Sequence, residues 1–190
     1  MDQSFARFLR NGLHGEVKVT DARRVPPSRP IRLTLKRLFP DYDAHRAAFA
    51  TRLDPAIAEN TAMLLEALNP PDSPPNVSET ALPDPPEASE AALETWDENV
   101  ARIWTEWNTL PQRFTPQRQA MEETLLRRFA SILNQTRQAE LGIDQYIWTT
   151  AGDNKVRSSH ASREGQTFSW DSGAIHPGSE PNCRCIAMPV

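Results

Sequence analysis

The spacing of apolar side chains predicts helices through the middle of the chain. Apolar residues recur every three or four positions over Tyr42–Leu68, over Glu90–Leu110, and from Thr115 to about Gly142. This spacing places them on one face of a helix. We expect Pro55 to mark a break, or a new helix start after Asp54.

Prolines also separate the last two predicted helices. Pro111 is expected to end the first of them, with Thr115 as the N-cap of the next and Pro116 at its first helical position. Because the connection is short, these helices are predicted to pack as an antiparallel hairpin. Its three tryptophans are expected in the core, since aromatic side chains dominate burial.

After Gly142 the helical spacing gives way to short segments typical of strands. Aromatic and β-branched residues predict strands at Tyr146–Thr150, Gln166–Trp170 and Cys183–Met188, with a short helix at Val156–Glu164. A small sheet with one short helix, following a helical hairpin, is an α+β arrangement. The predicted fold class is therefore α+β.

The N-terminal region has a weaker pattern. Residues 1–15 carry apolar side chains at helical spacing, and residues 16–21 alternate like a brief strand. Residues 22–32 then combine three prolines with four arginines, which breaks regular structure.

An acidic segment rich in proline divides the chain. Residues 69–89 contain seven prolines and almost no large apolar side chains, a composition typical of an extended linker. We therefore expect a basic arm and helices over 1–68, the linker over 69–89, the helical hairpin over 90–142, and a terminal module over 143–190.

Charge is distributed unevenly about a net value of -4. Residues 1–52 hold 11 Lys and Arg against 5 Asp and Glu, whereas the remainder holds 10 against 20. No apolar run approaches the roughly 18 residues that span a bilayer, and no signal-peptide core is present, so we expect a soluble protein made inside the cell, without a membrane partner.

The basic arm has two interpretations. It is either a solvated surface segment, or a docking element for an acidic partner or for DNA phosphates, which Lys and Arg bind without sequence preference. The residues that would make such contacts are Arg23, Arg24, Arg29, Arg32, Lys36 and Arg37.

The terminal module gathers the residues that are able to bind a metal. Two cysteines only two positions apart are better suited to act as free thiols or metal ligands than as a disulfide. With two histidines they form a nitrogen and sulfur set that zinc favours. The possible zinc ligands are His160, His176, Cys183 and Cys185.

Two other interpretations of the same polar residues remain open. In the first, Asp153 caps the short helix, Arg157 and His160 share one of its faces, and together with Asn182 and Arg184 they form a hydrogen-bonded cluster that stabilises a small module. In the second, His160 is a catalytic acid or base that Asp153 orients, while Arg157 or Arg184 stabilises an anion. No second carboxylate, phosphate loop or nucleophile motif accompanies His160 in the sequence, so enzyme activity is the less favoured interpretation.

The motifs of this module resemble those of a known family. They are WTTAGDxKVRSSH, EGQxFxW, HPG and PNCRCIAxP, which together run from Trp148 to Pro189. The combination resembles the C-terminal domain of the phage head morphogenesis family, the Mu F-like minor head proteins. The similarity covers Tyr146–Pro189, extends to the preceding helix from about Ser131, and does not cover residues 1–90. By position, the motif residues are Trp148, Asp153, Arg157, His160, Gly165, Asn182, Cys183, Arg184 and Cys185.

The resemblance implies a function in the phage head. It implies a minor capsid protein of the virion, made in the host cytoplasm, located at the capsid interior or the portal vertex, and acting in head assembly or in DNA packaging or ejection. The first expected partner is portal or major capsid protein, and DNA is a further partner for the basic arm. The alternative is a phage-borne or secreted effector whose terminal module has His-centred hydrolase, nuclease or transferase activity.

Overall fold

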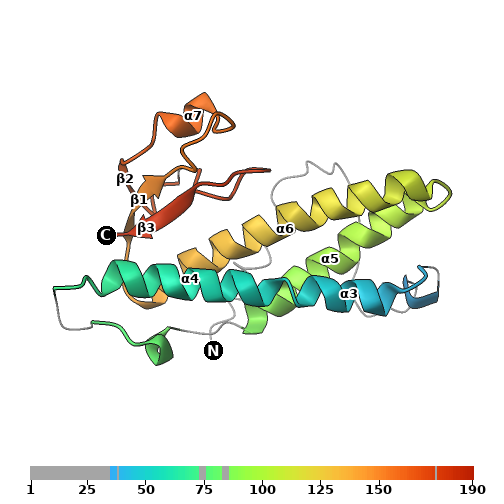
Figure 1. Cartoon of the computed structure of the whole chain (residues 1–190), viewed down its shortest axis with the longest axis horizontal. Coiled ribbons are helices and arrows are strands. Elements are labelled where there is room, and N and C mark those ends of the chain that lie inside the picture. Colours follow the sequence, from blue (N-terminus) through green and yellow to red (C-terminus); the bar gives the residue numbers. More distant parts are fainter. Residues whose placement is uncertain (1–34, 38, 73–75, 83–85, 174) are drawn as a thin grey trace. The chain divides into compact units, whose positions relative to one another are not determined.

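A computed structural model describes residues 35–190, except 38, 73–75, 83–85 and 174. It confirms the predicted α+β class, with helices followed by a small sheet (Figure 1). In chain order the elements are α3 (Tyr42–Ala50), α4 (Leu53–Leu68), the 3-10 helix η1 (Glu79–Ala81), α5 (Pro86–Trp107), α6 (Pro111–Glu140), β1 (Gln145–Thr149), α7 (Ser158–Ala161), β2 (Thr167–Ser169) and β3 (Ile186–Pro189).

The chain divides into two compact units. Of the described residues, one unit consists of those up to Leu53 together with Pro86–Leu126, and the other of those in Asp54–Pro85 together with Arg127–Val190. We call them the first and the second unit. The boundary falls inside α6, so this one helix contributes to both cores.

Part of the predicted N-terminal arm lies outside the described residues. This applies to the helix over 1–15, the strand over 16–21, and Arg23, Arg24, Arg29 and Arg32. Lys36 and Arg37 are described and exposed. Lys36 Nζ lies 3.0 Å from a carboxylate oxygen of Asp43.

The structure corrects two predicted helix boundaries. The break between α3 and α4 falls at Thr51 and Arg52, and Pro55 instead lies in the first turn of α4, where proline is tolerated. Pro116 does not begin a helix, because α6 starts at Pro111 and contains Pro116. The reason is burial of Phe114, whose ring packs edge-on against Trp104 with centroids 5.3 Å apart and thereby keeps the preceding turn helical.

The first unit has an aromatic core with a buried acid. Trp96 is fully buried and stacks on Phe49 at a centroid distance of 6.1 Å, and its Nε1 donates to Glu122 at 2.9 Å. Beside it, the buried carboxylate of Asp97 accepts hydrogen bonds from the Tyr42 hydroxyl at 2.5 Å and from Arg46 Nε at 3.0 Å. A neutral and a charged donor among the described residues therefore help to compensate for the burial of this charge.

Removing the Tyr42 hydroxyl tests this compensation. A Tyr42→Phe variant is expected to lower the free energy of unfolding by about 1 to 2 kcal/mol, because Asp97 stays buried with one donor fewer. The measurement is urea denaturation followed by far-UV circular dichroism. A Thr105→Ala control, at an exposed site on α5, should remain within about 0.5 kcal/mol of the parent. Equal stabilities of the parent and Tyr42→Phe would contradict the assignment.

The second unit joins α4 to the C-terminal part of α6 through polar side chains as well as apolar ones. Leu64 and Leu133 are fully buried in it. Asn60 Nδ2 donates to Asn134 Oδ1 at 3.1 Å, and Arg137 donates to Asn60 Oδ1 at 3.0 Å. The face of α6 turned toward α4 is therefore partly polar.

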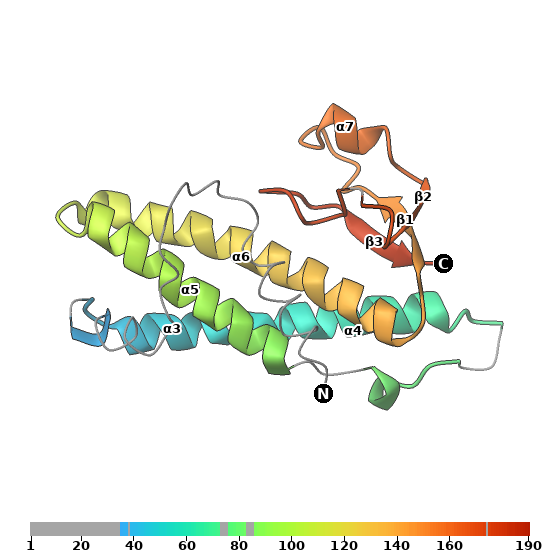
Figure 2. The same cartoon turned by 180° about the vertical axis from the view of Figure 1, so that it is seen from behind.

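A three-stranded antiparallel sheet completes the second unit, in the order β2-β1-β3. The central strand β1 pairs Tyr146 with Phe168 on one side and Trp148 with Ala187 on the other. Asn134 Nδ2 and Gln138 Nε2 both donate to the carbonyl of Ala187, at 2.8 and 2.9 Å. These bonds attach β3 to α6, beside which it runs in Figure 2.

The short helix of the terminal module is shorter than expected. It covers Ser158–Ala161, within the predicted range Val156–Glu164. Asp153 does not cap it, because its Oδ1 accepts from the backbone N–H of Lys155 in the preceding turn, at 3.0 Å. Among the described residues, none of the helices combines the length and apolar character needed to cross a membrane.

Candidate functional site

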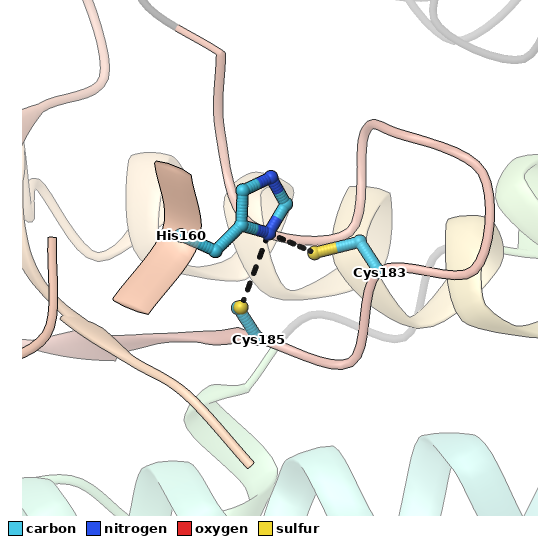
Figure 3. Close-up of side chains that lie close together, drawn as sticks. All are labelled: His160, Cys183 and Cys185. Atoms are coloured by element: carbon cyan, nitrogen blue, oxygen red, sulfur yellow. Dashed lines mark hydrogen bonds between the residues drawn. The ribbon is translucent and has the colours of Figure 1, made fainter. Parts of the chain in front are cut away.

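Three buried side chains that are able to bind a metal converge in the terminal module: His160, Cys183 and Cys185 (Figure 3). The Nδ1 atom of His160 lies 3.5 Å from the sulfur of each cysteine. All three ligand atoms lie within 4.8 Å of one another. Cys183 and Cys185 are both free thiols.

The C-x-C spacing brings both sulfurs to one side because the chain is extended there. Burial alternates from residue 183 to 187, with Cys183, Cys185 and Ala187 buried and Arg184 and Ile186 exposed. Alternate residues of an extended chain point to the same face. Both thiols therefore face the interior, in one cluster with Tyr146 and Trp148.

His160 is oriented by a carboxylate that the sequence interpretation did not identify. Its Nε2 lies 2.6 Å from Glu180 Oε2, on the side of the ring opposite the cysteines. Arg157 also reaches Glu180, at 3.3 Å, and donates to the carbonyl of Pro181 at 2.6 Å. Arg157 directly precedes α7 and His160 lies within it, and both side chains contact Glu180.

The surroundings of the thiols disfavour a bare thiolate. Burial raises the pKa of Cys185 to about 11, and the neighbouring Cys183 adds to this effect, whereas the Trp148 indole opposes it. Trp148 is fully buried, and by distance and angle its Nε1 has no hydrogen-bond partner among the described residues. Its ring meets that of His160 edge-on, with centroids 5.2 Å apart.

His176, the fourth predicted zinc ligand, lies apart from the cluster. Its Nδ1 is 2.8 Å from the Tyr146 hydroxyl, and its ring packs against Trp170 with centroids 5.0 Å apart. Burial raises the pKa of Tyr146 to about 12, so this hydroxyl stays protonated and donates to Nδ1. Burial also lowers the pKa of His176, which keeps the ring neutral. Of the four predicted zinc ligands, three therefore lie together, and His176 lies elsewhere.

Asp153 pairs with Arg184 and does not contact His160. Two oxygens of Asp153 accept from the Arg184 guanidinium at 2.6 and 2.7 Å. This contact is the main reason that the pKa of Asp153 falls to about 2 and that of Arg184 rises. The hypothesis that Asp153 orients a catalytic histidine therefore lacks its key contact, and Glu180 occupies that position.

The remaining motif residues shape the backbone of the module. Gly165 has a φ of +71°, and its N–H donates to the carbonyl of Trp148 at 2.9 Å, which closes the connection between α7 and β2. Asn182 also has a positive φ, and its Oδ1 accepts from Arg127 of α6 at 3.3 Å. The residues of the predicted polar cluster thus make separate contacts: Arg157 and His160 contact Glu180, Asp153 pairs with Arg184, and Asn182 contacts Arg127.

A cavity of about 260 Å³ adjoins the cysteine segment on the side of α4 and α6. Met63, Asn134 and Cys185 are among the residues that line it. Pockets for drug-sized ligands usually measure about 300 to 1,000 Å³. The cavity is smaller than these, so the histidine and cysteine cluster is the stronger candidate site.

Comparison with known proteins points to one family. A family model described as phage Mu protein F like protein matches residues 95–188. An uncharacterized protein of Haemophilus influenzae is 43% identical over 61 residues, which is 30% of this chain and 14% of that protein. The chain thus matches only a small part of this relative's length. No solved structure matches the chain.

The family match contains the whole candidate site. It begins within α5, continues through α6, and includes β1, α7, β2 and nearly all of β3. The residues that carry the sequence resemblance lie within this region or at its very end. Through residues 95–188, the chain belongs to the phage Mu F-like family.

Proposed function

We propose that this chain is a minor head protein that acts in phage head morphogenesis, with portal or major capsid protein as its first partner. The observation that carries the proposal is the family match over residues 95–188. Membership of this family points to a phage head morphogenesis protein. The corresponding location is the virion, at the capsid interior or the portal vertex.

The surface chemistry supports binding as the mode of action. The terminal module is small, and the side chains Asp153, Arg157, Arg184 and Glu180 are engaged with one another or with the backbone of the module. Residues 1–52 carry a net positive charge, which suits an acidic protein surface or DNA phosphates. We infer that the terminal module makes the specific contact with the head partner. The basic arm then adds an electrostatic contact.

Particle assembly tests the proposal. In a phage from which the corresponding gene is deleted, we expect fewer DNA-filled heads by electron microscopy. Complementation with the tagged full chain should restore the number of DNA-filled heads. The tagged protein should co-purify with the heads and with a portal ring. Normal numbers of filled, infectious heads without the protein would overturn the proposal. Toxicity relieved by a neighbouring immunity gene would instead indicate an effector.

The basic arm has its own matched test. Replacing Arg23, Arg24, Arg29 and Arg32 by glutamine removes charge and keeps side-chain length. We expect incorporation of this variant into heads to fall and to depend less strongly on salt, because fewer charged contacts remain to be screened. As the control, two arginines outside the arm, Arg102 and Arg113, are replaced by glutamine, and incorporation should stay at the parental level. Equal incorporation of both variants would refute a docking role for the arm.

A further inference from the structure

The spacing of the three ligand atoms matches that of a zinc site. Zinc lies about 2.3 Å from cysteine sulfur and about 2.0 to 2.1 Å from histidine nitrogen, in tetrahedral geometry. Those lengths place a nitrogen and a sulfur about 3.5 Å apart across the metal. Both distances from His160 Nδ1 to the two sulfurs are 3.5 Å.

Hydrogen bonding alone does not satisfy this arrangement. Because Nε2 of His160 lies 2.6 Å from the Glu180 carboxylate, Nε2 carries the proton and donates it. Nδ1 then has a single lone pair, which both thiols of Cys183 and Cys185 would have to share. A cation on the axis of that lone pair, between the sulfurs, accepts electron density from all three atoms at once.

The surrounding groups are those that support a metal centre. A carboxylate bound to the distal nitrogen of a ligating histidine fixes its tautomer and raises its basicity, and Glu180 is placed in this way on His160. A backbone N–H also approaches one of the sulfurs, since Gly178 donates to Cys183 at 3.3 Å. A donor directed at buried sulfur favours the thiolate, the form that binds a metal.

A metal here would connect parts of the module that are distant in sequence. His160 comes from α7, whereas the cysteines precede β3, 23 and 25 residues later. The apolar core of the module is small, with five buried residues and two partly buried aromatic ones. In small domains a bound metal contributes directly to folding free energy.

We propose that His160, Cys183 and Cys185 bind one zinc ion through three protein ligands, which leaves a fourth position to water or to a residue of a binding partner. Among the described residues, these three form the one set of His, Cys, Asp or Glu side chains that lie close enough together to bind a metal. Soft thiolates with an imidazole suit zinc, whereas magnesium and calcium require oxygen ligands. Because all three ligands belong to this chain, the proposed zinc site does not depend on which head protein is the partner.

Metal analysis of the full chain tests the site. Protein purified with zinc in the medium should contain about one zinc per chain and should lose thermal stability with a chelator. Cobalt in place of zinc should give thiolate-to-metal charge-transfer absorption and ligand-field bands typical of four ligands. These readouts need no variant. Absence of bound metal together with an unchanged Tm on chelation would overturn the proposal, and so would cobalt spectra without thiolate bands.

Variants distinguish this ligand set from others. Cys183→Ser and Cys185→Ser should each lose stoichiometric zinc, whereas His176→Gln, the matched histidine outside the cluster, should retain it. Glu180→Gln should keep zinc at saturating concentrations and weaken its binding about 10- to 100-fold, which identifies Glu180 as a positioning residue. Zinc retained by both cysteine variants, or lost only by His176→Gln, would refute the assignment.

Discussion

Replacing Trp148 by alanine should lower the free energy of unfolding by about 3 to 5 kcal/mol, as expected when a fully buried tryptophan leaves a cavity. Trp148 lies on the central strand of the sheet and is completely buried. Its ring meets that of Phe168 edge-on at 5.8 Å, and the Arg163 guanidinium lies 4.9 Å from its centroid. Because it also contacts His160, this change should weaken zinc binding as well.

A conservative variant separates packing from hydrogen bonding. Trp148→Phe keeps an aromatic ring in the core but removes the indole N–H near Cys185. We expect less than half of the loss in stability seen for alanine. The measurement is hydrogen-deuterium exchange with mass spectrometry, which reports on β1, β2 and β3 separately from the first unit. Parental protection of these strands in Trp148→Ala would contradict the central role of this side chain.

The corresponding change in the first unit is Trp96→Ala, for which we also expect a loss of about 3 to 5 kcal/mol. Trp96 is fully buried between Phe49 and Tyr42. Its removal leaves a cavity and also takes one donor from the buried carboxylate of Glu122. Arg118 still contacts that carboxylate at 2.5 Å, so the charge remains paired and the main cost is lost packing.

Exchange mass spectrometry checks this second prediction too. Faster exchange is expected in α3 and α5, with smaller changes in β1 to β3, because the two tryptophans belong to different units. Trp107→Ala is the matched control, since Trp107 is only half-buried and contacts the exposed Arg113. Trp107→Ala should lower the free energy of unfolding much less than Trp96→Ala does. Equal losses for Trp96→Ala and Trp107→Ala would show that burial does not determine the effect.

Local patterns predicted most of the secondary structure. Apolar residues at helical spacing identified α3 to α6, and aromatic and β-branched runs identified the three strands, because each signal is contained within one element. The errors occurred where tertiary packing opposed local preference. Burial of Phe114 extends α6 through Pro116, although proline alone favours a helix start.

The polar contacts of α6 could not be predicted from periodicity. Asn134, Arg137 and Gln138 are buried, although in a helical stripe such residues are assigned to the solvent face. Only the structure shows that Asn134 and Gln138 bond to the carbonyl of Ala187, and that Arg137 bonds to Asn60. A hint was available in the resemblance of this helix to the family motif, which extended back to about Ser131.

The sequence by itself determined the helices of the middle of the chain, the α+β class, the family and the types of residue at the candidate site. These properties follow from local spacing and from motifs contiguous in the chain. The tertiary structure decided which of these residues meet. It joined His160 to Glu180 and the two cysteines, placed His176 on Tyr146, and paired Asp153 with Arg184. These contacts depend on chain reversals between α7, β2 and β3, and local periodicity carries no information about distances across such reversals.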